Sequence, residues 1–240
     1  MNTSSQPDID KIEIIYEDDY VLVLNKPNNF LVHHSHYARN ISEDSLLDKF
    51  KSQRNQSIFP IHRLDRKTSG LLLCAKQKEF VTPFQALFNT NRIEKQYVAI
   101  VRGFTEKKFN IDTPVKHPES GHYKEALTVG ETLGQIEMPI AVGPYENSRY
   151  SLVKLIPQTG RIHQLRIHMN KISHPIIGDA KYGDRFHNRM FQAKLNCPYM
   201  FLHAEKLCFR HPYTHQLLEF KAAFQVDWND LLKQFEYMND

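Results

Sequence analysis

Residues 61–70 read Ile-His-Arg-Leu-Asp-Arg-Lys-Thr-Ser-Gly and run directly into the apolar residues 71–75. The one acid of this segment is Asp65. Its other charged residues are Arg63, Arg66 and Lys67. Pro60 and Gly70 bracket the segment with signals for an irregular, turn-rich backbone. Because a buried strand holds the preceding loop rigid while the loop side chains stay reachable, the sequence predicts a functional loop around Asp65 followed by a buried strand.

The composition is typical of a globular protein with a substantial core. The chain has 240 residues, of which 41% are hydrophobic, and this suits one large domain or two small ones. No apolar run approaches the roughly 20 residues of a membrane span, and the polar, acidic start lacks the features of a signal peptide. We therefore expect no membrane partner and a cytoplasmic location.

The charge distribution is compatible with nucleic acid as a partner. The formal net charge is only +4, which many ordinary enzymes share. The cations gather in the middle of the chain, whereas the acids concentrate near its ends. A basic middle is what a surface that follows RNA phosphates needs.

Neither the cysteines nor the histidines predict a metal site. The three cysteines, Cys74, Cys197 and Cys208, lack Cys-x-x-Cys spacing, and we interpret them as core thiols. His33, His34 and His36 lie close together in the sequence but have no supporting acids or thiols. We therefore expect no metal.

Apolar periodicity and turn residues predict a chain that mixes strands and helices, after a disordered tail over residues 1–10. The expected strands cover 12–16 and 21–24 as a hairpin, 70–75, 94–103, 110–115, 123–130, 136–142 and 148–156, with a further hairpin around 212–215. The expected helices cover 45–54 with Ser45 as N-cap, 78–89, 162–172, 185–194 and 227–237. In the strand over 94–103, Tyr97, Ala99 and Val101 share one face, so Tyr97 is expected to point inward.

A second unusual segment is residues 159–168, Thr-Gly-Arg-Ile-His-Gln-Leu-Arg-Ile-His. On a helix, Ile162, Leu165 and Met169 form one apolar stripe. Arg166 lies at the border of that stripe, so it is expected to be half-buried and to need a carboxylate partner.

Three segments, in the same order along the chain, resemble motifs of the RluA-type pseudouridine synthases. Residues 61–70 resemble the family motif His-Arg-Leu-Asp-Arg-x-Thr-Ser-Gly, and residues 159–168 resemble a second motif. Residues 95–99, Lys-Gln-Tyr-Val-Ala, match a third, and 23–27 look like part of the family's opening segment. The resemblance extends over about residues 12–222.

The resemblance implies the pseudouridine synthase fold, of the α+β class. This fold has a mixed, largely antiparallel bent sheet with flanking helices and a central catalytic cleft. Residues 11–240 would form the catalytic domain, with no RNA-binding domain of the S4 type before it.

The resemblance also implies an RNA-modifying site. Asp65 would supply the catalytic carboxylate, and Arg166 would keep it charged. Tyr97 would stack on the uracil and move a proton. Further RNA contacts would come from Arg63, Arg66, His62, Arg161 and His163. No cofactor is expected, because the isomerisation has no net redox change. Whether Asp65 attacks uracil C6, attacks ribose C1′ or takes a proton from C2′ stays open.

Within the family, the segments outside the catalytic motifs are most similar to synthases that modify uridine 65 of tRNA, in the T-stem near the acceptor arm. The region over 117–125 is shorter than in that group, which bears on the RNA partner. A ribosomal RNA synthase of the same family is the alternative, and we expect a monomer.

Three functions of other classes are alternatives for this sequence. They are a non-catalytic RNA-binding protein, a ribonuclease that uses His62 and Asp65, and a kinase with a His-Arg-Asp loop. The kinase is set aside, because a Leu separates Arg63 from Asp65 and no Asp-Phe-Gly follows.

Overall fold

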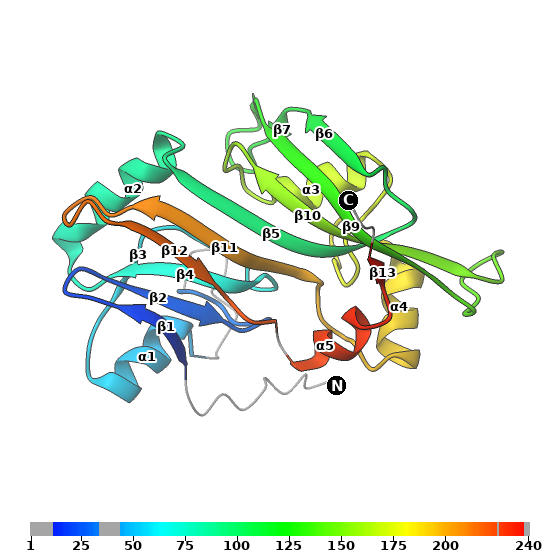
Figure 1. Cartoon of the computed structure of the whole chain (residues 1–240), viewed down its shortest axis with the longest axis horizontal. Coiled ribbons are helices and arrows are strands. Elements are labelled where there is room, and N and C mark those ends of the chain that lie inside the picture. The colour runs from blue at the N-terminus through cyan, green and yellow to red at the C-terminus, as the bar shows by residue number, and fades with distance from the viewer. Residues whose placement is uncertain (1–11, 34–43, 225, 238–240) are drawn as a thin grey trace. The chain divides into compact units, whose positions relative to one another are not determined.

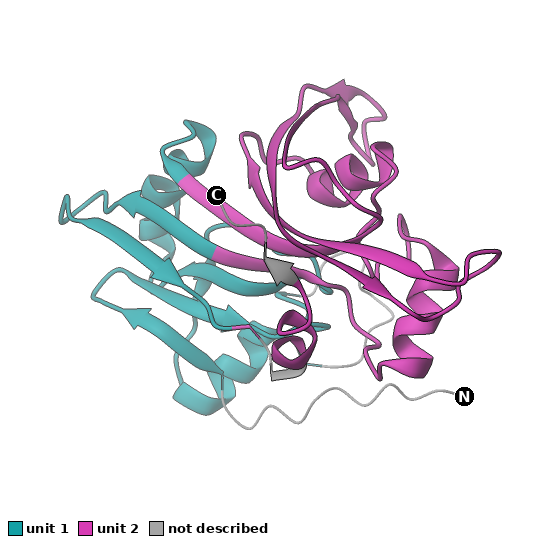
Figure 2. Ribbon diagram, turned by 45° about the vertical axis from the view of Figure 1, so that its right-hand side comes forward, with its two compact units in different colours: residues 1–93, 206–223 teal, residues 94–205, 224–240 magenta. Residues whose placement is uncertain are grey.

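A computed structural model describes residues 12–33, 44–224 and 226–237. The predicted tail over 1–10 lies outside this range, as do His34 and His36. The chain divides into two compact units, 1–93 with 206–223 and 94–205 with 224–240 (Figure 2). Among the described residues, no helix has the length and apolar character that a membrane span needs. Whether residues 11–240 act as one catalytic domain stays a prediction.

Unit 1 is built on strands that pair mostly in antiparallel fashion, with helices beside them. Its strands are β1 (Glu13–Glu17), β2 (Val21–Lys26), β3 (Phe59–Pro60), β4 (Ser69–Ala75), β12 (Leu217–Lys221) and the end of β11 (Leu202–Arg210). The strand order is β1-β2-β4-β11, with β3 on β4 and β12 on β11. The helices are α1 (Leu46–Arg54), the 3-10 turn η2 (Lys78–Phe80) and α2 (Val81–Asn89).

Local signals explain the first elements of this unit. The Asp18 carboxylate accepts the backbone N–H of Tyr20 and Val21 at 2.7 and 2.8 Å, which closes the predicted hairpin. Ser45 caps α1 and forms a capping box with Asp48, as the sequence predicts. All seven residues of β4 are buried, which confirms the buried strand after the Asp65 loop.

The helix expected over 78–89 is α-helical only from Val81. The physical reason is Pro83. In an α-helix that began at Lys78, position 83 would have to donate a backbone N–H to Glu79, and proline has none to give. Starting the α-helix at Val81 places Pro83 in the first turn, where no donor is needed.

Unit 2 contains a second set of antiparallel strands. They are β5 (Ile93–Arg102), β6 (Lys108–Asp112), β9 (Leu127–Met138), β10 (Ser148–Pro157), β13 (Glu236–Tyr237) and the start of β11, in the order β11-β5-β10-β9-β13 with β6 on β9. A separate two-stranded sheet joins β7 (Val115–Lys116) to β8 (Tyr123–Lys124). The helices are α3 (Gln164–Lys171), which lies beside β10 (Figure 1), α4 (Arg185–Lys194) and α5 (Val226–Leu232).

The alternation of β5 separates two hydrophobic clusters. Tyr97, Ala99 and Val101 pack in the cluster that includes Leu165 and Met169 of α3. Residues 98 and 100 belong instead to the cluster around Trp228, as the two predicted faces require. The inward orientation of Tyr97 is therefore confirmed.

Strand β9 corrects the prediction of separate pieces over 123–130 and 136–142. It runs without a break through Gly130 and Gly134. Gly130 lies opposite Phe109 of β6, and a Cβ at this position would overlap the Phe109 ring. The glycine makes room for an aromatic ring on the neighbouring strand. In the sequence alone, the same glycine is typical of a break between two strands.

The C-terminal helix is shorter than predicted. It ends at Leu232 rather than at Tyr237, and β13 follows. β13 pairs with Gln135 and Gly134 of β9, beyond the part of β9 that β6 covers. Hydrogen bonds to this strand edge replace those of further helical turns.

Two of the three cysteines fit the prediction of core thiols. Cys74 and Cys197 are buried, whereas Cys208 on β11 is only half-buried. Burial raises the pKa of the Cys74 thiol, which keeps it protonated and unreactive.

Candidate active site

The loop that carries Asp65 lies between β3 and β4 of unit 1. As predicted, its backbone is irregular, with a turn closed by a 3.0 Å bond from the N–H of Thr68 to the carbonyl of Asp65. The Asp65 side chain is half-buried. The loop therefore presents Asp65 from a defined main-chain turn.

The turn after β2 supports this loop through main-chain carbonyls. The Lys26 ammonium donates to the carbonyl of Arg66 at 2.9 Å, and the Asn28 amide donates to the carbonyl of Lys67. In return, the Arg66 Nε donates to the carbonyl of Asn29 at 3.1 Å. Three hydrogen bonds thus join the two segments directly behind Asp65.

Lys26 is the buried centre of this support. It has no exposed surface, and its Nζ also donates to the carbonyls of Pro27 and Phe30 at 2.8 and 2.9 Å. Burial lowers the pKa of Lys26 to about 7, while the nearby charge of Asp65 opposes that shift. Three carbonyl acceptors match the three N–H groups of an ammonium. The sequence alone did not predict this role, although an isolated lysine at the end of an apolar strand is a signal for it.

His62 has a structural role in the loop. Its Nε2 accepts the backbone N–H of Leu73 at 3.0 Å, and its ring stacks on Phe88 at a centroid distance of 4.8 Å. A nitrogen that accepts a hydrogen bond carries no proton of its own. The ribonuclease alternative requires His62 as a catalytic base. This geometry disfavours that role, because the Nε2 of His62 already accepts a hydrogen bond. RNA binding by His62 stays a prediction.

The two arginines of the loop differ in accessibility. Arg66 is half-buried and tied to Asn29. Arg63 is exposed and forms no hydrogen bond or ion pair with the part of the chain that the structure describes. Arg63 is therefore the better placed of the two to reach a ligand.

In unit 2, Tyr97 is half-buried on β5, opposite Leu155 of β10. Packing against the α3 cluster fixes its ring. A tyrosine held in this way offers a rigid aromatic surface and a hydroxyl.

Arg166 lies on α3 and is 8% exposed, so it is more buried than expected. Its Nε and Nη2 donate to the two carboxylate oxygens of Asp179 at 2.7 and 2.8 Å. Its guanidinium also lies 5.1 Å from the ring centre of Tyr182. The predicted need for a carboxylate partner is confirmed. That Asp179 is this partner was not predicted from the sequence.

Asp179 is held in its charged form. Burial pushes the pKa of its carboxyl up, but hydrogen bonds and charge from Arg166, with the N–H groups of Tyr182 and Lys181, outweigh burial and lower it. Gly178 precedes it with φ +79°, and a Cβ there would overlap the carbonyl of Tyr199. Only glycine fits this turn, which places Asp179 in reach of Arg166.

Helix α3 begins later than the sequence predicts. It starts at Gln164, because His163 has a left-handed backbone with φ of 57°, and a right-handed helix cannot include such a residue. Ile162 is therefore not part of the helical stripe. The Gln164 side chain accepts from Thr159 Oγ1 at 2.7 Å and from the N–H of Arg161 at 3.0 Å, which fixes the loop before the helix.

The last two predicted RNA contacts, Arg161 and His163, lie just before this helix. Arg161 is exposed, and its Nε donates to the carbonyl of Glu125 at 2.9 Å. His163 Nδ1 lies 3.0 Å from the hydroxyl of Tyr182, the same residue that Arg166 faces. Arg166 and His163 thus converge on Tyr182.

The structure places the predicted catalytic residues in two units. Asp65 belongs to unit 1, and Tyr97 and Arg166 belong to unit 2. The ion pair expected between Arg166 and Asp65 stays a prediction, as does the catalytic cleft.

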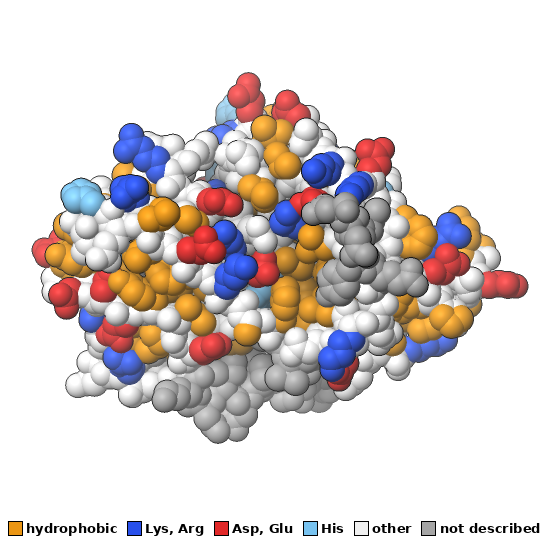
Figure 3. Space-filling view, viewed as in Figure 1, with side chains coloured by type: hydrophobic (Ala, Val, Ile, Leu, Met, Phe, Trp, Pro, Cys, Tyr) orange, Lys and Arg blue, Asp and Glu red, His pale blue; other side chains and the backbone are white. Residues whose placement is uncertain are grey.

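No metal centre emerges from the part of the chain that the structure describes, where no three His, Cys, Asp or Glu side chains gather. His33 is described, but the other two histidines of the predicted surface cluster are not. On the face drawn in Figure 3, the coloured Lys and Arg side chains are interspersed with Asp and Glu. Net charge alone therefore does not locate an RNA-binding surface on this face.

Comparison with known proteins assigns the family. The family model for RNA pseudouridylate synthase matches residues 20–171, which include the Asp65 loop, Tyr97 and Arg166. The chain belongs to this family. The resemblance to RluA-type pseudouridine synthases is thereby confirmed, and with it the enzyme class.

Two curated relatives match over nearly the whole chain. Both are named tRNA pseudouridine synthase C. The one from Haemophilus influenzae is 40% identical over 238 residues, which cover 95% of this chain and 99% of the relative. The one from Haemophilus ducreyi is 40% identical over 236 residues, which cover 94% of this chain and 96% of the relative.

A solved structure confirms the fold class. Human RNA pseudouridylate synthase domain containing 1 aligns with a TM-score of 0.75 and 23% identity, over 98% of this chain and 91% of the human chain. At this identity the likeness concerns the fold alone. The α+β class with a mixed, largely antiparallel sheet is confirmed, as the family resemblance implies.

Proposed function

We propose that this protein isomerises one uridine of tRNA to pseudouridine, namely uridine 65 in the T-stem near the acceptor arm. The observation that carries the proposal is the 40% identity to a tRNA pseudouridine synthase C over 95% of this chain and 99% of the relative. The match extends over nearly the whole length of both chains. The assignment to position 65 rests on the similarity of the segments outside the catalytic motifs.

The reaction exchanges one bond to the sugar for another. The bond between uracil N1 and ribose C1′ breaks, and a bond between uracil C5 and C1′ forms. The proton on C5 leaves, and N1 takes up a proton, so no electron acceptor or external group is required. The protein must bind the uridine outside the base stack, supply an anionic carboxylate and move these protons.

We assign the carboxylate to Asp65. It is the one acid among residues 61–70, and hydrogen bonds to the main chain of the next two residues hold its loop. Tyr97 would provide the aromatic surface for the base and a hydroxyl for proton transfer. Its half-buried, packed ring supports that role.

Arg166 would be a cationic part of the site, held rigid by Asp179. Because Asp179 already neutralises part of its charge, Arg166 would act mainly through its fixed position and its N–H groups. Arg63 would contact RNA from its exposed position in the Asp65 loop. We further propose that the enzyme acts as a monomer in the cytoplasm.

The decisive experiment compares Asp65→Asn with the wild type on tRNA labelled with tritium at uridine C5. Release of tritium should fall by at least about a thousandfold, in line with loss of an essential nucleophile or base, while filter binding of tRNA is kept. Asp19→Asn is the matched control, because it removes the same charge from an exposed residue of the same unit. Retained turnover in Asp65→Asn would show that the carboxylate is assigned to the wrong residue.

A separate measurement tests which RNA is the substrate. Wild-type enzyme should modify a tRNA transcript with uridine at position 65 and leave a transcript with cytidine there unmodified. Modification of ribosomal RNA fragments instead of tRNA would favour the alternative of a ribosomal RNA synthase.

A further inference from the structure

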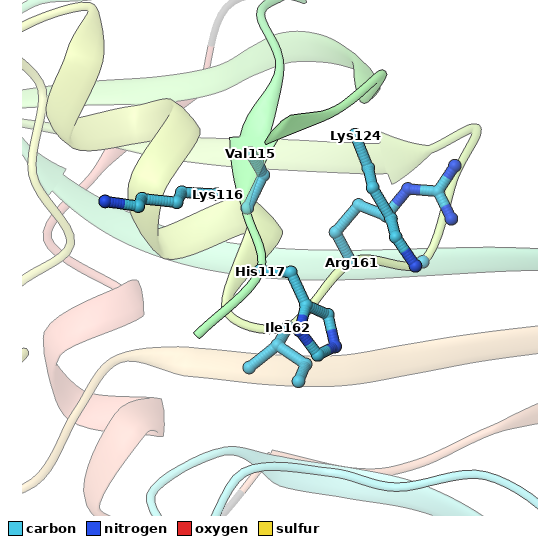
Figure 4. A pocket seen from close by; sticks show the side chains of 7 residues that line it. Val115, Lys116, His117, Lys124, Arg161 and Ile162 are labelled. Atoms are coloured by element: carbon cyan, nitrogen blue, oxygen red, sulfur yellow. The ribbon is translucent and has the colours of Figure 1, made fainter. Parts of the chain in front are cut away.

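A basic pocket lies within unit 2, outside the residues assigned to catalysis. It has a volume of about 170 Å³ and is lined by Val115, Lys116, His117, Lys124, Gly160, Arg161 and Ile162 (Figure 4). A cavity that holds one water needs only about 10–15 Å³ on this measure, so this volume admits a larger group. No acidic residue is among those that line it.

Two of its cations have no anionic partner in the described part of the chain. Lys124 and Arg161 are both exposed, and neither forms an ion pair with a described residue. The Arg161 Nε is engaged by the carbonyl of Glu125, which orients the guanidinium and leaves its two NH₂ groups for a ligand. A pocket with unneutralised, oriented cations attracts an anion.

His117 adds a third donor. Its Nδ1 accepts the N–H groups of Glu119 and Ser120, both at 3.3 Å. With Nδ1 as acceptor, the ring proton resides on Nε2, which then serves as a donor. The side chains of His117, Lys124 and Arg161 therefore offer N–H groups of three kinds.

The hairpin formed by β7 and β8 decides which lysine can take part. Val115 pairs with Lys124, and Lys116 pairs with Tyr123. Because successive residues of a strand point to opposite faces, Lys124 and Lys116 lie on opposite faces of the hairpin. Figure 4 agrees, since the Lys116 ammonium extends away from Lys124 and Arg161. Lys116 is thus a natural control for Lys124.

We propose that this pocket binds a backbone phosphate of the RNA substrate. The proposal rests on the proposed function and extends it to a specific contact. Arg161 and Ile162 belong to the loop that leads directly into α3, the helix that carries Arg166. A phosphate bound here would fix the RNA backbone against the segment that supports the site. Arginine and lysine together are the usual partners of such a phosphate.

The experiment measures tRNA binding as a function of salt for Lys124→Gln, Lys116→Gln and the wild type. One phosphate contact contributes about 0.9 to the slope of log affinity against log salt concentration. Lys124→Gln should lower the magnitude of that slope by about one, so that its defect shrinks roughly eightfold for each tenfold rise in salt. Lys116→Gln should match the wild type.

Arg161→Gln and the double variant with Lys124→Gln test whether one phosphate is shared. If both side chains hold the same phosphate, the double variant should lose about one in slope, not two. Equal defects in Lys124→Gln and Lys116→Gln would overturn the proposal, because they would indicate a diffuse charge effect. Unchanged slopes in all variants would overturn it too.

The same titrations with an unrelated RNA hairpin separate this inference from the proposed function. A phosphate contact reads no sequence, so Lys124→Gln should weaken binding of both RNAs alike. If the wild type does not modify tRNA yet these slopes change as stated, the proposed substrate fails and the phosphate site stands. If tRNA is modified and the slopes do not change, only the phosphate site fails.

Discussion

The Asp65 loop of unit 1 and the start of α3 in unit 2 are both held by a buried cation, but in different ways. Lys26 donates to three main-chain carbonyls, one of them at Arg66 in the loop. Arg166 donates instead to the side-chain carboxylate of Asp179. An anchor on the main chain leaves the side chains of the loop available for chemistry. An anchor on a side chain fixes the guanidinium of Arg166 itself.

The two anchors also differ in electrostatics. Lys26 donates only to neutral main-chain carbonyls, and burial lowers its pKa to about 7. Arg166 and Asp179 form a pair of full charges, and the pKa of Asp179 is lowered in spite of burial. Arginine keeps its charge at any ordinary pH. Removing a partner should therefore have a larger effect on the Arg166 pair than on Lys26.

The largest effect is expected from Asp179→Asn. It leaves the buried Arg166 charge without its counterion, and breaking a buried ion pair from one side costs about 3–5 kcal/mol. Urea unfolding should show this loss in the free energy of unfolding. Glu137→Gln is the control, because it breaks the solvent-exposed pair with Arg149, and exposed pairs contribute little to the free energy of unfolding. Equal losses in the two variants would mean that Arg166 is not anchored by Asp179.

A smaller loss is expected from Lys26→Met. It leaves buried carbonyls without a donor, at about 1–3 kcal/mol for each unsatisfied group. It also removes a buried ammonium that was itself costly, so the net loss should be about 2–3 kcal/mol. Turnover should also fall, and by more than the loss of stability alone would explain, because the loop that carries Asp65 loses a hydrogen bond that holds it. Lys51→Met, an exposed lysine of α1, provides the comparison in both unfolding and tritium release. If Lys26→Met were active and as stable as the wild type, Lys26 would not be what holds the Asp65 loop.

Both anchors mark the limit of what the sequence could predict. Local patterns predicted the Asp65 loop, the buried strand after it, the two faces of β5 and the cap at Ser45, since each depends on neighbours within a few residues. The bond from Lys26 to the Arg66 carbonyl spans 40 residues, and no periodicity records it. A tertiary partner also changed the interpretation of Gly130, where the Phe109 ring needs the space of a side chain.

The site shows the same division between local and distant information. The motif around Arg166 indicated a buried arginine, but its partner lies 13 residues on, in a turn that only Gly178 permits. The start of α3 was misplaced because the left-handed backbone at His163 leaves no mark in an apolar stripe. The residue types thus predicted a buried arginine that needs a carboxylate, while the distant partner Asp179 decides how it is held.

The finest separation of the two anchors is expected from the pH dependence of stability. The pKa of Asp179 is lower in the folded chain than its ordinary value of about 3.9. The unfolded chain then binds more protons below that value, so the stability supplied by Asp179 is lost as pH falls through the folded pKa. The gap in unfolding free energy between wild type and Asp179→Asn should narrow below about pH 4.

Lys26 should respond at the opposite end of the scale. Its folded pKa of about 7 lies below the ordinary value of about 10.4. Between these values the unfolded chain keeps a proton that the folded chain has released, so stability rises with pH, by at most about 1.4 kcal/mol per pH unit. The difference in unfolding free energy between wild type and Lys26→Met should therefore increase from pH 7 to pH 9 and stay constant below pH 6. Urea unfolding of both proteins over pH 5–9 measures it. A gap that is flat up to pH 9 would show that the three carbonyls keep Lys26 protonated, and both anchors would then carry full charge.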